Sequence, residues 1–326
     1  MIDTSTQLLR PHSLENYIGQ QNAVNTLRVF IEAVKSKGQP SEHILLYGPP
    51  GIGKTTLANI IAHELEGEIK VTSGPVIQKT GDLAAILTNL KDNDVLFIDE
   101  IHRLPKAVEE MLYPVMEDYF LDIIIGKGPS ARTVRLPVPR ITIVGATTRF
   151  AMLSAPLRDR FGLVLRLDFY TESDMIEIIM RSAALLSLPL EKKHAREIAL
   201  RARRTPRLAN RILKRAHDML LVQKITAFSD TLFDQLFELL ELDAFGLSEI
   251  DRQYMRVIAD KFQNNPVGIE TIASALSEDK QTIEEFIEPY LLQMGFLRKT
   301  PRGRTITPRA LSHLHIVNSD LQEALI

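Results

Sequence analysis

Residues 48–55 of the chain have the sequence Gly-Pro-Pro-Gly-Ile-Gly-Lys-Thr. This stretch matches the phosphate-loop pattern G-x-x-x-x-G-K-[ST] at every position. An apolar run, His43–Tyr47, comes directly before it, and a helical pattern, Lys54–Leu65, follows. Glycines let successive backbone N–H groups point at an anion, and the helix N-terminus adds positive charge. The stretch predicts a strand–loop–helix unit that holds a nucleotide phosphate chain; a chance glycine-rich turn is the alternative.

A second apolar run, Val95–Ile98, ends in the pair Asp99 and Glu100. Lys54 is expected to reach the β- and γ-phosphates and the Thr55 hydroxyl to ligate Mg²⁺. The carboxyl ends of strands are where open α/β sheets bind ligands, so we assign Asp99 to the magnesium shell and Glu100 to the attacking water. An Asp-Glu pair could also cap the next helix, but the phosphate loop favours the catalytic interpretation.

Polar residues follow the next apolar run as well. The stretch Gly145–Arg149 contains two threonines, and we choose Thr148 as the side chain that contacts the γ-phosphate or the water. Thr147 and Thr148 could equally be turn residues. His102, next to the acidic pair, is expected to be a surface or core histidine rather than a ligand.

Three arginines have spacings that suggest contacts with phosphate. Arg158 and Arg160 lie in a short loop before the last strand. They belong either to a solvated face or salt-bridged turn, or to an arginine finger aimed at a neighbour's γ-phosphate. A finger supplied in trans requires an oligomer. Thr205 and Pro206 have the chemistry of a helix start, which puts Arg207 in a first helical turn, where a cation opposes the macrodipole. A bound anion would remove that mismatch.

The rest of the chain divides into three parts. Two further buried strands, Ile141–Gly145 and Val164–Phe169, predict a mostly parallel, doubly wound α/β sheet. Helical patterns follow in the region 170–243, at Glu172–Leu186, Ala195–Arg203, Ala209–Gln223 and Asp230–Leu240. From residue 244 to 326 a winged helix is predicted from Glu249–Lys261, Gly268–Leu276, Asp279–Met294 and two short strands, Phe296–Lys299 and Thr305–Thr307. We therefore expect domains at 1–169, 170–243 and 244–326.

Composition restricts the classes of function. The chain has 326 residues, a formal net charge of −2 and no cysteine, which excludes disulfides, thiolate zinc sites and cysteine nucleophiles. No apolar run approaches a membrane span, and residues 1–10 lack the apolar core of a signal peptide, so a cytoplasmic protein is expected. Basic residues are concentrated at 192–215, interpreted as a solvated or inter-subunit face, and in the predicted wing.

The predicted wing is the candidate DNA-binding element. Arg298, Lys299, Arg302 and Arg304 surround its turn. The preceding helix, 279–294, is acidic and would be repelled by phosphates, so it is not expected to read bases. A basic wing can neutralise phosphates without base preference, which suits sliding along DNA; a solvated hairpin is the alternative.

Taken together, these motifs resemble those of the AAA+ ATPases and, among them, the RuvB family of Holliday-junction motors. The similarity covers about residues 8–315 and rests on Leu9-Arg10-Pro11, Gly48–Thr56, Thr72–Pro75, Gly81–Asn89, Leu96–Leu104, Leu112–Asp118, Gly145–Arg149, Pro156–Gly162 and Thr300–Arg304. One departure is Arg204, where the family usually has glycine before Thr-Pro-Arg.

The resemblance implies an ATP- and Mg²⁺-dependent motor for branch migration in recombination and repair. It selects Arg160 over Arg158 as the finger and implies that Arg207 is a second sensor. It also implies nucleotide contacts from a larger set: Leu9, Arg10, Gly51, Gly53, Lys54, Thr55, Thr56, Glu117, Asp118, Tyr119 and Tyr170.

The implied partners are double-stranded DNA or a Holliday junction, further copies in a homohexamer, RuvA through a hairpin at residues 120–140, and RuvC. Spacing alone favours ordinary strand core for Val134 and Leu136 in that hairpin. Two alternatives remain open, namely a clamp-loader-like or transcription-associated switch that uses ATP to assemble a partner, and a small-molecule P-loop kinase. The missing cysteines and the winged tail count against a clamp loader, and the two further domains against a kinase.

Overall fold

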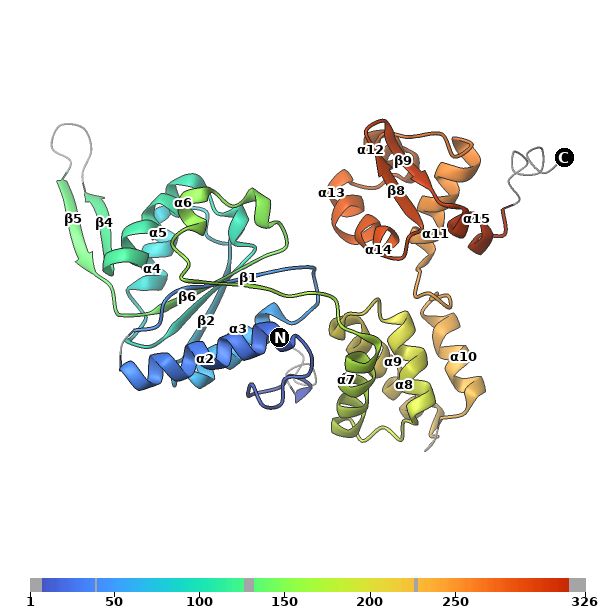
Figure 1. Ribbon diagram of the computed structural model, residues 1–326, viewed down its shortest axis with the longest axis horizontal. Helices are drawn as coiled ribbons and strands as arrows, with labels where there is room; N and C mark the ends of the chain where they lie inside the picture. Colours follow the sequence, from blue (N-terminus) through green and yellow to red (C-terminus); the bar gives the residue numbers. More distant parts are fainter. Residues whose placement is uncertain (1–7, 39, 126–131, 226–227, 317–326) are drawn as a thin grey trace. The chain divides into compact units, whose positions relative to one another are not determined.

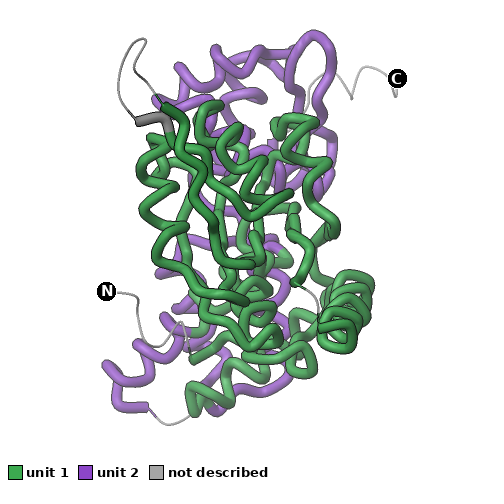
Figure 2. Tube along the Cα trace, turned by 90° about the vertical axis from the view of Figure 1, so that its left-hand side faces the viewer, with its two compact units in different colours: residues 1–188, 204–213 green, residues 189–203, 214–326 purple. Residues whose placement is uncertain are grey.

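The computed structural model describes residues 8–38, 40–125, 132–225 and 228–316, shown in Figure 1. The chain separates into two compact units, coloured in Figure 2. The first comprises Met1–Leu188 and Arg204–Leu213, and the second Pro189–Arg203 and Lys214–Ile326. Within the described ranges, no helix is both long and apolar enough to cross a membrane.

The first unit contains a parallel five-stranded sheet with the order β2-β3-β6-β1-β7. The bounds are β1 Ile44–Tyr47, β2 Ile69–Ser73, β3 Val95–Asp99, β6 Thr142–Thr147 and β7 Leu163–Arg166. Strand β1 pairs with β6 on one side and β7 on the other, so that Leu46 lies beside both Ala146 and Leu165. This confirms the predicted doubly wound α/β fold.

Strand β2 was not among the strands predicted from the sequence. It lies at the edge of the sheet, and none of its residues is fully buried. Val71 is 53% exposed, and Lys70 and Thr72 interrupt the apolar run. An edge strand pairs on one side only and can remain polar, so this strand lacks the buried apolar run that marks the central strands. Strand β7 also ends earlier than predicted, at Arg166.

Helices cover both faces of the sheet, as Figure 1 shows. Helices α2 (Gln21–Lys37) and α3 (Lys54–Glu64) lie on one face, and α4 (Thr80–Leu87) and α5 (Lys106–Asp118) on the other. Short helical segments, η1 (Ile101–Arg103), η3 (Phe150–Met152) and α6 (Ala155–Arg158), connect the later strands. The core between the sheet and α4–α5 is built from fully buried aliphatic residues, including Leu87, Leu96, Ile98, Val108 and Leu112.

An antiparallel hairpin extends from this unit (Figure 1). It consists of β4 (Phe120–Ile125) and β5 (Arg132–Pro137), which form a sheet of their own. Leu136 lies opposite Leu121 and packs against the α/β core, whereas Val134 lies opposite Ile123, farther along the hairpin. The base of the hairpin is therefore strand core, as spacing predicted, and the part beyond it stands outside the main sheet.

One buried histidine makes the stability of this unit depend on pH. His43 Nε2 lies 3.0 Å from Met116 O, and Nδ1 accepts a hydrogen bond of 3.0 Å from Ile143 N. The imidazole is therefore held neutral, with its proton on Nε2. Burial lowers the pKa of His43 from 6.5 to about 4, partly offset by the Met116 carbonyl.

We expect acid to destabilise the α/β core through this group. Because the unfolded chain binds the proton at higher pH than the folded chain, stability is lost as pH falls from about 6.5 to about 4, by roughly 3 kcal/mol. Urea unfolding of His43→Gln at several pH values should show a flatter profile than wild type in this window. The exposed His63→Gln serves as control; equal slopes for wild type and His43→Gln would disprove the assignment.

Four longer helices follow the sheet: α7 (Glu172–Leu185), α8 (Lys192–Arg201), α9 (Pro206–Gln223) and α10 (Asp230–Leu239). Thr171 and Asp174 form a capping box at the start of α7. Helix α7 belongs to the first unit, α8 and α10 belong to the second, and the boundary between the units falls within α9. The helical prediction for this region is confirmed, with ends shifted by a few residues.

The C-terminal part of the second unit is a winged helix. Its elements are α11 (Glu249–Arg256), η4 (Val257–Lys261), α12 (Ile269–Leu276), α13 (Lys280–Thr282), η5 (Ile283–Ile287), α14 (Glu288–Gln293), β8 (Leu297–Thr300), β9 (Gly303–Ile306) and α15 (Pro308–His313). Two helices that the sequence predicted as continuous α-helices, 249–261 and 279–294, each contain a π-helical segment, η4 or η5. Local periodicity does not distinguish a single wider turn from the α-helix around it.

Within the second unit, Arg203 joins the end of α8 to the winged helix. Its Nε donates to Gly246 O at 2.9 Å, and its guanidinium pairs with Asp251 and lies 4.9 Å from the ring centre of Tyr290. Asp251 also accepts from Ser248 N at 2.7 Å, at the start of α11. One arginine thus ties three segments of the unit together.

Candidate active site

The phosphate loop lies between β1 and α3, as the motif predicted. Gly48 has φ 148° and Gly53 φ 104°, conformations that favour glycine. A Cβ at Gly48 would lie 2.1 Å from Leu167 O, and one at Gly53 would lie 2.8 Å from the Tyr17 hydroxyl. Both glycines are therefore required by backbone conformation and by close neighbours.

Lys54 is folded back onto this loop. Its Nζ donates to Gly48 O and Pro49 O, each at 2.8 Å. Burial lowers the pKa of Lys54 to about 8, and the negative charge of Asp99 acts in the opposite direction. A buried ammonium held by two carbonyls is poised to exchange them for the oxygens of a triphosphate, which carry more negative charge.

The two acidic residues lie at the carboxyl end of β3. Asp99 is the last residue of the strand, and Glu100 follows with φ 48°, an uncommon conformation for a residue other than glycine. Glu100 accepts a hydrogen bond of 3.0 Å from Arg103 NH1. Asp99 and Glu100 thus lie at the carboxyl ends of the parallel strands, where the phosphate loop also lies, and Glu100 is paired with Arg103 at an exposed position.

Magnesium fits this edge in the manner of phosphate-loop enzymes. Among the described residues, no group of three or more His, Asp or Glu side chains could hold a metal on its own. Mg²⁺ commonly uses one or two protein ligands together with phosphate oxygens and water. Thr55 and Asp99 are the residues here that would supply those protein ligands, and the ion would supply positive charge that neutralises a bound triphosphate.

The two threonines after β6 have different surroundings. Thr147 is fully buried, and its hydroxyl lies 2.9 Å from His102 Nδ1 and accepts from Arg149 N at 2.9 Å. Thr148 is exposed just beyond the strand. Thr147 and His102 are therefore structural, and Thr148 is the threonine available to a ligand.

Arg207 lies against the phosphate loop. Its backbone N–H donates to Gly51 O at 3.3 Å, and an added Cβ on Gly51 would meet the Arg207 side chain at 3.2 Å. The helix α9 begins at Pro206, as predicted, so the Arg207 side chain starts from the first turn. The fold thus brings a cation from a distant part of the sequence to the phosphate loop.

Arg204 occupies the hinge position where the resembling family has glycine. Its φ is 55°, so the backbone keeps a conformation that glycine adopts easily. Its Nε donates to Tyr170 O at 2.6 Å, and Tyr170 N donates to Arg204 O at 3.2 Å. The side chain therefore adds a bond across the hinge that glycine could not make.

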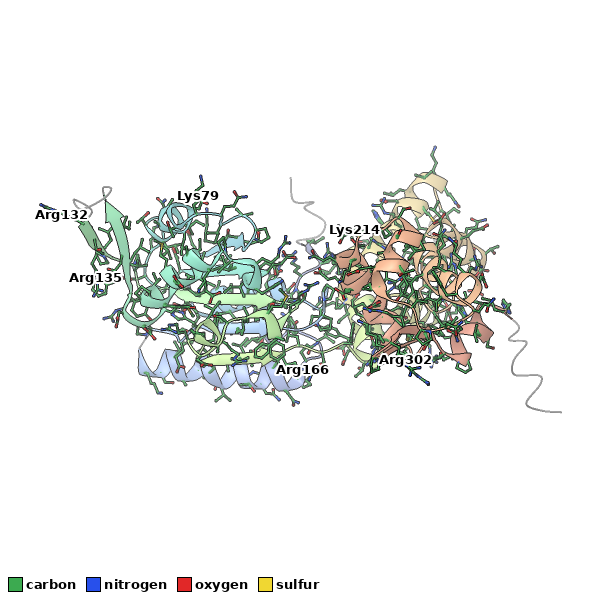
Figure 3. All side chains as sticks on the ribbon, turned by 90° about the horizontal axis from the view of Figure 1, so that it is seen from above. Lys79, Arg132, Arg135, Arg166, Lys214 and Arg302 are labelled. Atoms are coloured by element: carbon green, nitrogen blue, oxygen red, sulfur yellow. The ribbon has the colours of Figure 1, made fainter. Side chains whose placement is uncertain are left out.

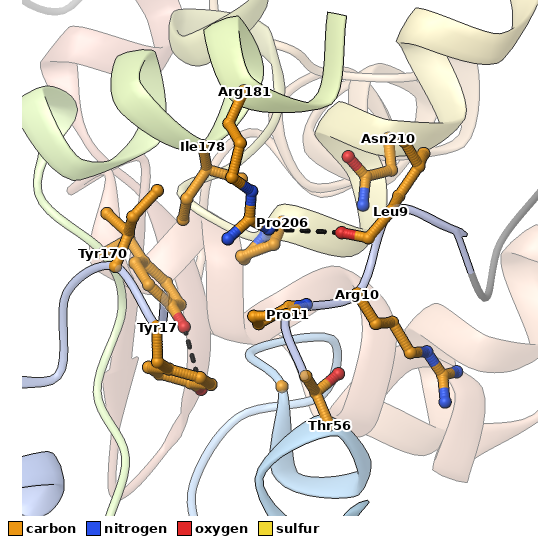
Figure 4. Close-up of a pocket in the computed structure, with 12 residues that line it drawn as sticks. Leu9, Arg10, Pro11, Tyr17, Thr56, Tyr170, Ile178, Arg181, Pro206 and Asn210 are labelled. Carbon is orange, nitrogen blue, oxygen red and sulfur yellow. Dashed lines mark hydrogen bonds between the residues drawn. The ribbon is translucent and has the colours of Figure 1, made fainter. Parts of the chain in front are cut away.

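A pocket beside the phosphate loop has the character of a site for a nucleotide base (Figure 4). It is lined by Leu9, Arg10, Pro11, Tyr17, Ile18, Gly53, Thr56, Tyr170, Ile178, Arg181, Pro206 and Asn210. The Tyr170 hydroxyl lies 3.1 Å from both the Tyr17 hydroxyl and Ile52 O. Burial raises the pKa of Tyr17 to about 12, so this wall is uncharged.

Five residues that line this pocket, Leu9, Arg10, Gly53, Thr56 and Tyr170, are among the nucleotide contacts that the family resemblance implies. Arg181 is not among them. Arg181 donates from NH1 to Asn16 O at 2.7 Å and from NH2 to Leu9 O at 3.1 Å, as Figure 4 shows for the second bond. It anchors the N-terminal segment as one wall, and no sequence pattern signals a contact over that separation.

Arg160 lies near the amino ends of the parallel strands, whereas the phosphate loop of the same chain lies at their carboxyl ends. The N–H of Leu163, three residues later, donates to His43 O at the start of β1, and that of Leu167 donates to Tyr47 O at its end. Residues 163 and 167 are roughly 13 Å apart along the strand. Since Arg160 precedes the strand, its guanidinium cannot reach the phosphate loop of the same chain.

The Arg160 side chain is held firmly in place. NH1 donates to Pro156 O at 2.7 Å, NH2 pairs with Glu117 at 3.1 Å, and the guanidinium lies 4.1 Å from the ring centre of Tyr113. Arg158 is looser, with a 3.7 Å pair to its neighbour Asp159 and 41% of its side chain exposed. Arg160 is therefore the more tightly held and Arg158 the more exposed of the two. The choice of Arg160 as the finger rests on the family resemblance and stays a prediction.

Glu117, Asp118 and Tyr119 also lie near the amino ends of the parallel strands. They end α5 directly after Met116, whose carbonyl contacts His43 at the start of β1. The structure does not bring them to the phosphate loop of their own chain. Their expected nucleotide contact stays a prediction, and it is compatible only with the nucleotide of another copy.

The fold and this site define a P-loop ATPase of the AAA+ class. The defining features are a phosphate loop after the first strand, an Asp-Glu pair on a parallel strand, a threonine after β6 and an arginine from a following helix. Family models match in sequence: the Holliday junction DNA helicase RuvB P-loop domain over residues 9–167, the RuvB AAA lid domain over 170–243 and the RuvB C-terminal winged helix domain over 244–315.

Solved structures agree with these family matches. The RuvB Holliday junction branch migration motor of Thermotoga maritima is 48% identical, with 95% of this chain and 99% of that chain covered and a TM-score of 0.86. Two mutant forms of that protein have the same identity and coverage, with TM-scores of 0.87 and 0.88. The chain belongs to the RuvB family.

Proposed function

We propose that this protein is the ATP-driven motor of Holliday-junction branch migration, acting as a ring of identical copies, in the predicted form a hexamer, on double-stranded DNA. The observation that carries the ring is the position of Arg160. Because its guanidinium cannot reach the phosphate loop of its own chain, a complete site needs the Arg160 of one copy beside the Lys54 of the next. An interface of this head-to-tail kind generates a ring when the rotation between successive copies closes, and the family resemblance supports the closed form.

The proposed catalytic roles follow the geometry of the site. Glu100 orients and polarises the attacking water, and Thr148 contacts the water or the γ-phosphate. Lys54 and Arg207 bind phosphate from within the chain, and Arg160 neutralises charge that develops on a neighbour's γ-phosphate. Cycles of binding and release at the interfaces then move the DNA contacts of the ring along the duplex.

Each predicted domain has its own proposed function. Residues 1–169 bind and hydrolyse ATP, 170–243 sense the nucleotide, and 244–326 hold DNA through the wing. The hairpin at 120–140 is the proposed docking element for RuvA, with RuvC in the resolving complex. Its support is the position of β4 and β5 outside the main sheet, with Arg132 and Arg135 exposed on β5 (Figure 3); the loop at 126–131 is outside the described residues.

The test is branch migration of a synthetic four-way junction with labelled arms. The full-length chain with ATP and Mg²⁺ should dissociate the junction into duplexes, faster with a RuvA-type partner, and should not do so with a non-hydrolysable analogue. If ATP is consumed but the junction persists with and without the partner, the chain is a binding switch rather than a branch-migration motor.

A further inference from the structure

The carboxylate of Glu288, beneath the wing, is completely buried. It belongs to the acidic stretch 279–294, which was predicted to repel DNA phosphates, but its side chain is 0% exposed. The helix α14 begins at this residue, and the wing strands β8 and β9 pack over it. An ionised carboxylate in such a place must be paired, because its desolvation is costly.

The two carboxylate oxygens of Glu288 make four polar contacts. Oε1 accepts from the Tyr254 hydroxyl and from Arg304 Nε, each at 2.8 Å. Oε2 pairs with Lys299 Nζ at 2.5 Å and with Arg304 NH2 at 3.4 Å. Burial raises the pKa of Glu288, but bonds from Arg304, Lys299 and Tyr254 outweigh burial and leave the pKa below its usual value.

The pairing of the wing strands explains why a carboxylate is needed there. Lys299 and Arg304 lie directly opposite each other in the β8–β9 ladder, on one face of the hairpin. Like charges in directly opposed positions destabilise a ladder. Glu288 lies between these cations, and Glu284 lies 3.6 Å from Arg304 NH2, so two acids balance two bases.

Arg304 is also fixed through its backbone. Arg304 N donates to Val267 O at 2.8 Å, and Val267 N donates to Arg304 O at 3.0 Å. Gly303 has φ 140°, and a Cβ there would lie 2.5 Å from Val267 O. The Arg304 side chain is only 16% exposed, so it is a structural part of the wing.

The other two wing cations face outward. Arg298 lies on the opposite face of the ladder from Lys299, and both Arg298 and Arg302 are exposed. Arg302 occupies the turn and points away from the body of the domain in Figure 3. The Lys299 side chain is also 44% exposed, but Glu288 balances its charge. Arg298 and Arg302 are therefore the two of these four wing cations that do not contact Glu288.

We infer that Glu288 is a positioning residue that divides the wing cations into two classes. Lys299 and Arg304 bind Glu288 and hold the hairpin, and Arg298 and Arg302 contact DNA phosphates. The inference rests on the proposed DNA-binding function of the wing. It narrows the predicted DNA contacts from four residues to two.

The first test is the salt dependence of duplex binding by the full-length chain, measured by fluorescence anisotropy. Arg302→Gln should reduce the slope of log K against log salt by about 0.9 per engaged wing, because one phosphate contact is lost. Lys299→Gln should leave this slope unchanged. If Lys299→Gln reduces the slope as much as Arg302→Gln does, the inference is wrong; if wild type binds no duplex, the proposed function itself fails.

The second test measures whether DNA affinity rises or falls when Glu288 is neutralised. Net charge alone predicts a rise, and the pairing of Glu288 predicts a fall. Glu288→Gln removes a negative charge next to a DNA-binding wing, yet affinity should fall about tenfold because the cations then repel each other. Adding Lys299→Gln to this variant should restore most of the affinity although another cation is lost. A further fall in the double variant would mean that Lys299 contacts DNA. Glu278→Gln, the same change at an exposed site of the domain, is the control and should not weaken binding.

Discussion

Replacing Arg160 with alanine should lower the rate of ATP hydrolysis by a factor of about 10³ or more, with little change in nucleotide affinity. An arginine finger stabilises charge that develops on the transferred phosphoryl group, and its removal costs about that much. Because Arg160 lies at the edge away from its own phosphate loop, nucleotide binding by a single chain does not depend on it. Steady-state turnover and binding of a fluorescent ATP analogue measure the two quantities separately.

The matched control is Arg158→Ala, two residues away and more exposed. It should keep turnover within a few-fold of wild type, since surface substitutions away from special contacts have small effects. Arg160→Lys should behave like the alanine variant, because lysine cannot keep the bonds to Pro156 and Glu117 together with the ring contact. Loss of activity in Arg158→Ala alone would reassign the finger.

Replacing Lys54 with alanine should reduce ATP hydrolysis at least about 100-fold and also weaken nucleotide binding, because the ammonium neutralises the β- and γ-phosphates in both the ground and transition states. Lys106→Ala, whose side chain is 90% exposed at the start of α5, serves as control and should be fully active. Turnover of Lys54→Ala within tenfold of wild type would show that the loop is not the hydrolytic site.

Mixing these two inactive variants tests whether the site is shared. In a mixed ring, about one interface in four joins an intact Lys54 to an intact Arg160. Activity should therefore reappear on mixing Lys54→Ala with Arg160→Ala, and should depend on total protein concentration. A mixture no more active than its parts would mean that each chain completes its own site.

Local sequence patterns were sufficient to predict much of the secondary structure and the nucleotide-binding motif of this protein. The phosphate loop and the helix start at Pro206 are present where they were predicted. The strands β1, β3, β6 and β7 and the winged helix are present with ends shifted by up to three residues. Each depends on interactions between residues close in sequence, such as glycine conformations, apolar runs and caps. The resemblance to a known family then supplied roles for residues that spacing alone left ambiguous.

Other features were decided by contacts between distant parts of the chain. Strand β2 can remain polar because it lies at an edge of the sheet, and Thr147 is buried beside His102 whereas Thr148 is exposed. Arg181 lines the pocket beside the phosphate loop and bonds to Leu9 across the fold. No local pattern contains these pairings.

The clearest contrast lies in the charged residues. The basic wing and the acidic helix before it follow from residue types alone. The burial of Glu288 between Lys299 and Arg304, with Arg302 exposed, depends on how the chain folds. The charge of a side chain is set by its residue type, whereas its burial and its ion-pair partners are set by the residues that surround it in the folded chain.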